Sequence, residues 1–142
     1  MSKNIISFSL WGDNPFYNVG AIRNAEQALE HYEGWICRYY IGTDVPKETI
    51  DALNELPNTE TIIMENEKND WMGMFWRFYA VSDPDAEYII FRDTDCRVNN
   101  RESMAVREWM DSGNTLHIMR DHPMHTEPIM GGMWGVNGPN FM

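Results

Sequence analysis

The sequence predicts an α/β fold class: one domain with an open, mostly parallel β-sheet and helices on both faces. Apolar, strand-like runs alternate with segments whose apolar residues recur at helical spacing, which is typical of parallel strands joined by right-handed crossovers. Residues 88–91 are Tyr, Ile, Ile and Phe, as expected for a strand buried on both faces of such a sheet. The length of 142 residues fits a single domain, residues 1–142, with a substantial core.

The first half of the chain predicts a β-α-β-α-β order with short loops. One helix is expected from a cap at Asn18 to about Tyr32, with Gly34 as its stop. A second helix is expected with Pro46 in its first turn, ending at Pro57. The expected strands are residues 5–10, 35–41 and 61–64.

The second half begins with an unusually apolar segment. Residues 71–82 carry apolar side chains on nearly all sides, which predicts a helix buried on most of its surface. Arg77, inside this segment, is expected to pair with Asp93 or Asp95 or to meet an anionic ligand, unless its head group extends to the surface. The remaining expected elements are the central strand at 88–92, a helix from Asn99 to about residue 112, and a strand at 116–120.

Asp93 and Asp95 follow the central strand directly. Ligands of open α/β sheets bind beyond the carboxyl ends of the strands, and residues i and i+2 of an extended segment point the same way. Both carboxylates can therefore reach one ion, and oxygen ligands of this kind suit a divalent cation. The alternative is a loop in which both aspartates are solvated or cap the following helix.

Other charged residues close to this pair are candidate ligand contacts. Arg92 and Arg97 flank the carboxylates and could contact an anion. Asp121 shares a loop with His122 and His125, and either imidazole could ligate a metal. Ordinary loop residues would give the same pattern.

A glycine-rich segment near the end of the chain is a weaker signal. Gly131, Gly132 and Gly135 would permit the close approach of a ligand, and Trp134 could stack on a sugar. Glycines around a core tryptophan would look the same.

Charge and composition exclude some classes of function. Acidic side chains outnumber basic ones by 22 to 11, giving a net charge of −11 without a basic stripe, so nucleic-acid binding is not expected. An acidic protein that binds a phosphate compound needs local cations or a metal. Cys37 and Cys96 predict reduced thiols in a cytoplasmic protein. No signal peptide is visible, and no stretch approaches the ~20 apolar residues of a membrane span.

Two other motifs fit the carboxylate pair less well. A helix-loop-helix calcium site fails because Arg97 and Met104 occupy its fifth and twelfth positions. A phosphatase of the haloacid-dehalogenase type also places an Asp-x-Asp pair after an apolar strand, one aspartate being the nucleophile. The chain has no lysine after Asp95, which disfavours that chemistry.

An ordered set of motifs, spanning roughly residues 71–135, resembles nucleotide-sugar glycosyltransferases of the GT-A fold, a Rossmann-like α/β fold. It is most similar to bacterial and viral enzymes of polysaccharide or glycan synthesis. The motifs are Phe75-Trp76-Arg77-Phe78, Phe91-Arg92-Asp93-Thr94-Asp95-Cys96-Arg97, and residues 102–109, 117–123 and 131–135.

The resemblance implies a metal-dependent transfer of a sugar from a nucleoside-diphosphate sugar to a glycan or other acceptor. Asp93 would face the ribose or the metal, and Asp95 would ligate manganese or magnesium, with His122 or His125 as a third ligand. The metal would stabilise the leaving nucleoside diphosphate. The loop at residues 11–14, including Trp11, would approach the nucleotide base.

The resemblance also implies a role for Arg77 and a candidate base. Arg77 would steady the carboxylates or the phosphates, and Asp121 is the best candidate for the base of an inverting reaction. Because enzymes of this fold are usually longer, the chain is expected to be a minimal enzyme, a fragment, or a donor-binding half that needs a partner or a second copy. A non-catalytic module that kept only the donor site is the alternative.

Overall fold

The computed structural model describes residues 3–65, 71–94, 100–113, 116–118 and 133–137. These residues contain a six-stranded sheet of order β3-β2-β1-β4-β6-β5. Strands β1 to β4 are parallel, whereas β6 is antiparallel to both of its neighbours, β4 and β5. The predicted open, mostly parallel sheet is therefore confirmed. The strands are β1 (Lys3–Leu10), β2 (Ile36–Gly42), β3 (Thr59–Met64), β4 (Ala86–Arg92), β5 (Leu116–Ile118) and β6 (Met133–Asn137).

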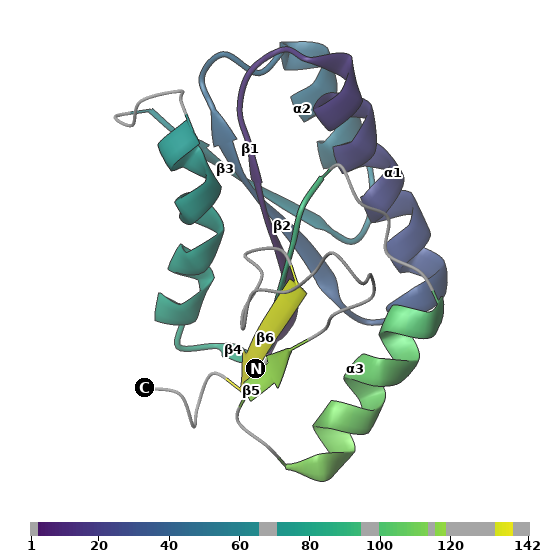
Figure 1. The fold of residues 1–142 in the computed structure, drawn as a ribbon. Helices are drawn as coiled ribbons and strands as arrows, with labels where there is room; N and C mark the ends of the chain where they lie inside the picture. The colour runs from purple at the N-terminus through teal and green to yellow at the C-terminus, as the bar shows by residue number, and fades with distance from the viewer. Residues whose placement is uncertain (1–2, 66–70, 95–99, 114–115, 119–132, 138–142) are drawn as a thin grey trace, which may run out of the picture.

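Helices cover both faces of the sheet, as predicted (Figure 1). Three α-helices share a core cluster with one face, and a 3-10 helix, η1, packs on the other. The helices are α1 (Pro15–His31), α2 (Lys47–Asn54), η1 (Trp71–Ser82) and α3 (Asn100–Ser112). The β1-α1-β2-α2-β3 order that the first half of the chain predicts is also confirmed.

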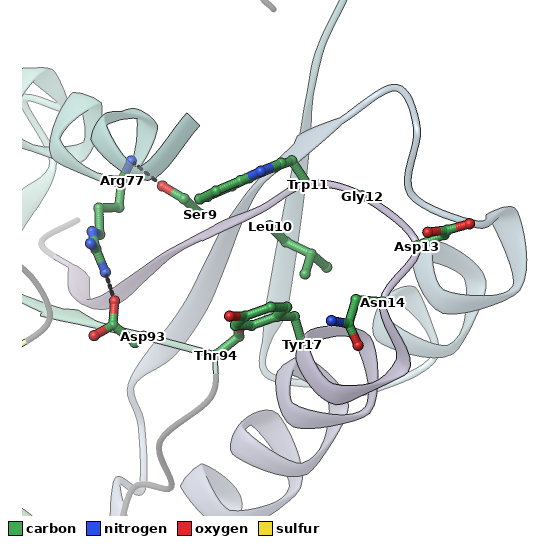
Figure 2. A pocket seen from close by; sticks show the side chains of 10 residues that line it. All are labelled: Ser9, Leu10, Trp11, Gly12, Asp13, Asn14, Tyr17, Arg77, Asp93 and Thr94. Carbon is green, nitrogen blue, oxygen red and sulfur yellow. Dashed lines mark hydrogen bonds and ion pairs between the residues drawn. The ribbon is translucent and has the colours of Figure 1, made fainter. Parts of the chain in front are cut away.

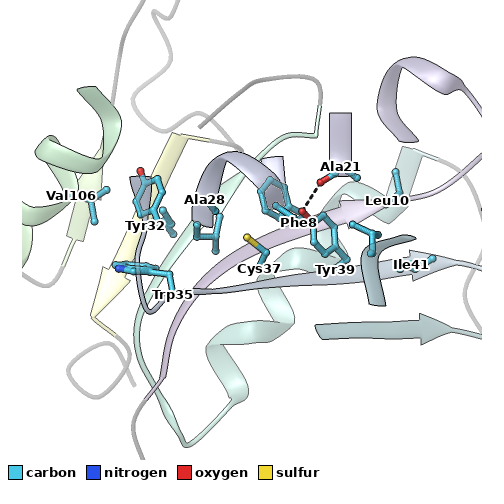
Figure 3. Close-up of a cluster of buried hydrophobic side chains, with 14 of the residues drawn as sticks. Phe8, Leu10, Ala21, Ala28, Tyr32, Trp35, Cys37, Tyr39, Ile41 and Val106 are labelled. Carbon is cyan, nitrogen blue, oxygen red and sulfur yellow. Dashed lines mark hydrogen bonds between the residues drawn. The ribbon is translucent and has the colours of Figure 1, made fainter. Parts of the chain in front are cut away.

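Strand β1 divides its side chains between the two layers, because successive residues of a strand point to opposite faces. Ile6, Phe8 and Leu10 are buried in the cluster beneath the α-helices (Figure 3). Phe8 stacks on Tyr39 of β2 with ring centroids 4.8 Å apart, and the Tyr39 hydroxyl donates to the Ala21 carbonyl of α1 at 2.7 Å. The alternate residues of β1 face η1.

The start of α1 differs from the prediction. The helix begins at Pro15, and the Asn14 side chain caps it by accepting the N–H of Phe16 at 2.9 Å. Proline suits the first helical position because its missing N–H would have had no partner there. Asn18, the expected cap, is a buried residue of the first turns, and its side-chain amide donates to the carbonyls of Gly12 and Asn14.

Strand β6 is an element that the sequence did not predict. Gly135 lies in this strand opposite Ile90 of β4. A Cβ atom at Gly135 would lie 2.8 Å from the Ile90 side chain, 2.9 Å from the Ile89 carbonyl and 3.3 Å from Trp109 of α3. This glycine is therefore explained by close packing within the domain rather than by a ligand.

The segment at residues 71–82 is helical as predicted, but η1 has 3-10 geometry. Trp76, Arg77 and Ala80 are buried against the sheet, whereas Tyr79 is 50% exposed. For residues 76–82, whose burial the structure describes, the side toward the sheet is buried as expected, whereas Tyr79 is open to solvent.

An ionic network ties the end of η1 to the sheet. Arg38 of β2 is buried and pairs with Asp83, just after η1, at 2.7 Å and with Glu60 of β3 at 2.9 Å. Lys3 of β1 pairs with the same Glu60 at 3.3 Å. Burial on its own would raise the pKa of Asp83, but the hydrogen bonds from Arg38 and from the Asp85 N–H outweigh it and hold this pKa below its ordinary value.

The predictions of reduced thiols and of no membrane span can be compared with the structure. Cys37 carries a free thiol, and burial in the core raises its pKa to about 12, so this thiol is unreactive. Cys96 lies outside the described residues. In the parts of the chain that the structure describes, no helix is both long and apolar enough to cross a membrane.

Candidate functional site

A cavity of about 550 Å³ lies at the carboxyl edge of the sheet, beyond β1 and β4 (Figure 2). Its volume is within the usual range for sites that bind small molecules. In Figure 2 the Arg77–Asp93 pair lies at one end and the loop with Asp13 and Asn14 at the other. The lining residues are Ser9, Leu10, Trp11, Gly12, Asp13, Asn14, Tyr17, Arg77, Asp93 and Thr94.

Arg77 and Asp93 form an ion pair at the wall of this cavity. The Arg77 Nη1 atom lies 2.5 Å from Asp93 Oδ1 and donates to the carbonyl of Arg92, the last residue of β4, at 3.0 Å. Arg77 is 3% exposed, so the expectation that it pairs with a carboxylate of the Asp-x-Asp motif is confirmed and the surface alternative is excluded. The pair joins η1 to the end of the central strand.

The backbone of Arg77 is fixed by two serines of β1. The Ser7 hydroxyl donates to the Arg77 carbonyl at 2.6 Å, and the Arg77 N–H donates to Ser9 Oγ at 2.8 Å. Ser7 and Ser9 occupy alternate positions of the strand and face η1, which explains two buried polar side chains in its otherwise apolar part, residues 5–10.

The Arg77–Asp93 pair has hydrogen-bonding groups that the described residues do not occupy. Within the described residues, the buried Nε of Arg77 has no hydrogen-bond partner. The Asp93 side chain is 43% exposed, and Arg77 contacts its Oδ1. Because Asp93 lines the cavity and is partly exposed, its carboxylate has capacity for a further polar ligand. The pair offers an anion a guanidinium and a cation a carboxylate.

The loop after β1 is held in place on both sides. Gly12 has a φ of 81°, in the left-handed region that favours glycine, and its N–H donates to Oδ1 of Asp44 at 2.8 Å. Trp11 meets Trp76 of η1 edge to face, with centroids 6.4 Å apart. The indole of Trp11 therefore stands at the cavity against a buried aromatic ring.

A contact from α1 fixes the other wall. The side-chain amide of Asn24, which is buried, donates to the Thr94 carbonyl at 3.3 Å. Thr94 follows Asp93 directly, so α1 holds the chain where it leaves β4. The carboxylate is thus supported from two layers, by η1 through Arg77 and by α1 through Thr94.

The structure brings together three of the site residues that the sequence predicted. Trp11, Arg77 and Asp93 all line the cavity. Arg92, a predicted anion contact, instead points into the core, where it is 1% exposed and its Nε lies 3.4 Å from Glu102 of α3. We therefore assign Arg92 to the packing of α3 against β4.

The other predicted site residues lie outside the described residues or are described only in part. Asp95, Asp121, His122 and His125 fall in undescribed segments, as does Arg97. The backbone of Trp134 lies in β6 opposite Phe91 of β4. Within the described residues, no cluster of three metal-ligating side chains is found, and Asp93 is the single predicted metal ligand among them.

Several residues of the site were missed by the sequence interpretation. Tyr17 and Thr94 line the cavity, and Ser7 and Ser9 hold Arg77. The two serines had a signal, because polar residues at alternate positions of a buried strand must find partners on one face. Tyr17 had none, because the helix was predicted to begin after it.

Comparison of the sequence with models of known protein families finds no match, and comparison with curated proteins finds no relative.

Proposed function

We propose that this protein is a metal-dependent glycosyltransferase that uses a nucleoside-diphosphate sugar. The observation that carries the proposal is one cavity lined by Trp11 of the first loop and by the Arg77–Asp93 ion pair, in which the Asp93 carboxylate is partly exposed. A nucleoside diphosphate has the same two chemistries, a flat aromatic base and a charged phosphate group. The cavity lies at the carboxyl ends of parallel strands, where open α/β sheets bind ligands.

The residues present fit a divalent cation in part. Asp93 offers a carboxylate that is open to the cavity, and Asp95 is two residues further along the chain. We propose that both hold manganese or magnesium, with His122 or His125 as a further ligand. When bound, the cation would offset the charge of the diphosphate leaving group. The net charge of −11 makes such an offset necessary for an anionic ligand.

The chain's own residues would bind and orient the donor. Arg77 would direct its guanidinium to the phosphates while it holds Asp93, and Trp11 would cover the base, with Tyr17 at the same cavity. Asp121 remains our proposed base for an inverting reaction.

Calorimetry with nucleoside diphosphates, with and without manganese, tests the proposal. We expect binding that strengthens when manganese is present and that is lost in the variant Asp95→Ala, whose circular dichroism and melting temperature should match the wild type. A folded wild-type sample that binds no nucleoside diphosphate in either condition would exclude the proposed donor site. Binding that survives Asp95→Ala would exclude Asp95 as a ligand.

The second candidate is a module that binds nucleotides or glycans without turnover. It is favoured by one observation: in the described lining of the cavity, the carboxylates are Asp13, on the first loop, and Asp93, which already pairs with Arg77. Neither is placed as a general base. Release of nucleoside diphosphate from a panel of nucleotide sugars separates the two candidates, because only the enzyme releases it catalytically.

We also propose a cytoplasmic location, with a glycan or other acceptor as the second substrate. The free, buried thiol of Cys37 supports a reducing compartment. Thiol labelling of unfolded protein taken directly from cells measures this, and two labelled cysteines are expected; a disulfide would contradict it.

A further inference from the structure

We propose that Ser7 and Ser9 are positioning residues for the Arg77–Asp93 pair. Their role in donor binding rests on the proposed function, whereas their effect on Arg77 does not. Together the two hydroxyls engage the N–H and the carbonyl of one residue, at 2.8 Å and 2.6 Å. Contacts on both backbone groups fix where the side chain of Arg77 begins and in which direction it extends.

This fixation matters because Arg77 reaches its partners from a different layer. Arg77 lies on η1, whereas the carbonyl of Arg92 and the carboxylate of Asp93 lie at the end of β4. A 3-10 helix has poorer hydrogen-bond geometry than an α-helix and is usually short. On its own, η1 would therefore hold Arg77 less rigidly than an α-helix would. The serines transfer the rigidity of the sheet to η1 at the residue that carries the guanidinium.

A variant of Ser7 tests the positioning of Arg77 separately from any direct contact with a ligand. Ser7 is fully buried and does not line the cavity, so it does not contact a ligand there, and its hydroxyl group reaches the site through Arg77. Ser9 also lines the cavity and could contact a ligand itself. Ser7→Ala is therefore the decisive variant, and it creates little empty space.

The competing explanation is that the serines merely attach η1 to the sheet. The ion pair of Arg38 with Asp83 provides a matched control, because it attaches η1 at its far end without touching Arg77. Asp83→Asn should weaken the attachment and leave the site unchanged. A purely structural role predicts that Ser7→Ala and Asp83→Asn behave alike.

The experiment uses the full chain and two measurements. The first is the ¹⁵N–¹H NMR signal of Arg77 Nε, identified by its absence in Arg77→Lys and observable because this buried group exchanges slowly with water. The second is the affinity for a nucleoside diphosphate with manganese. We expect Ser7→Ala to shift or broaden the signal and to lower the affinity about tenfold, a typical cost of losing a supporting contact. Ser9→Ala should do the same, and Asp83→Asn should change neither.

The inference is overturned if the Arg77 signal in Ser7→Ala stays at its wild-type position, or if Asp83→Asn moves it equally. It is also overturned if the signal moves while the affinity of a binding-competent protein stays constant. If the wild type binds no nucleoside diphosphate, the proposed function fails, and the NMR signal alone still decides whether the serines position Arg77.

Discussion

Two buried arginines on the same face of the sheet are used in different ways. Arg38, near the amino end of β2, pairs with the two carboxylates of Asp83 and Glu60. Arg77, near the carboxyl end of β4, pairs with one partly exposed carboxylate, Asp93, and its Nε has no partner among the described residues. The first arrangement satisfies its cation within the protein. The second leaves capacity beside a cavity.

The difference separates a structural network from a candidate site by chemistry rather than by burial. Both arginines are more than nine-tenths buried, so burial alone does not distinguish them. What distinguishes Arg77 is a deficit of partners together with the space for a ligand. Native proteins rarely leave a buried donor unpaired, and such exceptions are often functional.

The largest effect on stability is expected for Arg38→Met. Removal of this cation leaves the largely buried Asp83 without its ion-pair partner and leaves Glu60 with Lys3 alone, and breaking a buried pair in this way costs about 3 kcal/mol. Urea unfolding measures the loss. The folded fraction should bind nucleoside diphosphate with wild-type affinity, and a parallel loss of binding would show that the two arginines do not have separate roles.

The same substitution at Arg77 is expected to give the opposite result. In Arg77→Met the half-exposed Asp93 can be solvated, and a buried donor without a partner is removed, so the free energy of unfolding should change by only about 1 kcal/mol. Donor affinity should fall about 100-fold, equivalent to about 2.7 kcal/mol. A stable variant that binds normally would place the ligand elsewhere.

The sequence predicted the architecture well because its signals were local. Alternating strand and helix patterns and a fully apolar run at 88–91 were sufficient for the parallel part of the sheet. The start of α1 was predicted four residues late because Asn14 and Asn18 are both good caps, and only the three-dimensional contacts distinguish them. Strand β6 was missed because its short run contains a glycine. Glycine is needed there because Ile90 and Trp109 approach its backbone closely.

The Arg77–Asp93 pair could be predicted because one residue implied its partner. A lone arginine in an apolar helix had to find an anion, and the Asp-x-Asp pair at the end of the following strand was the expected partner. Arg92 could not be assigned in the same way, because its partner Glu102 lies on a separate helix. In the sequence, Arg92 looks like Arg97, since both flank the carboxylate pair. The alternation that turns Ser7 and Ser9 toward η1 could be predicted, but not that Arg77 would stand above them.

Gly135→Ala tests whether the glycine of β6 belongs to the core or to the site. An added methyl group would overlap the Ile89 carbonyl and the Ile90 side chain, so a loss of about 1–2 kcal/mol is expected from overpacking. Thermal or urea unfolding measures the loss. Nucleotide affinity should not change, because Gly135 does not line the cavity. A large loss of affinity without a loss of stability would return this glycine to the site.

The smallest effect is the pH dependence that Asp83 contributes. Arg38 holds the pKa of Asp83 below its ordinary value in the folded protein, despite the opposing effect of burial. A carboxyl group whose pKa is lower in the folded than in the unfolded state stabilises the fold above the unfolded pKa, about 3.9 for aspartate, and loses this contribution as the pH falls through the folded value. Wild type should therefore exceed Asp83→Asn in stability at pH 6, and the difference should shrink below about pH 4. Urea unfolding of both proteins from pH 6 to pH 3 measures it. A difference that is constant over this range would mean that Asp83 acts through shape rather than charge. The contrast between Arg38, which pairs with two carboxylates, and Arg77, which pairs with one, would then have no electrostatic basis.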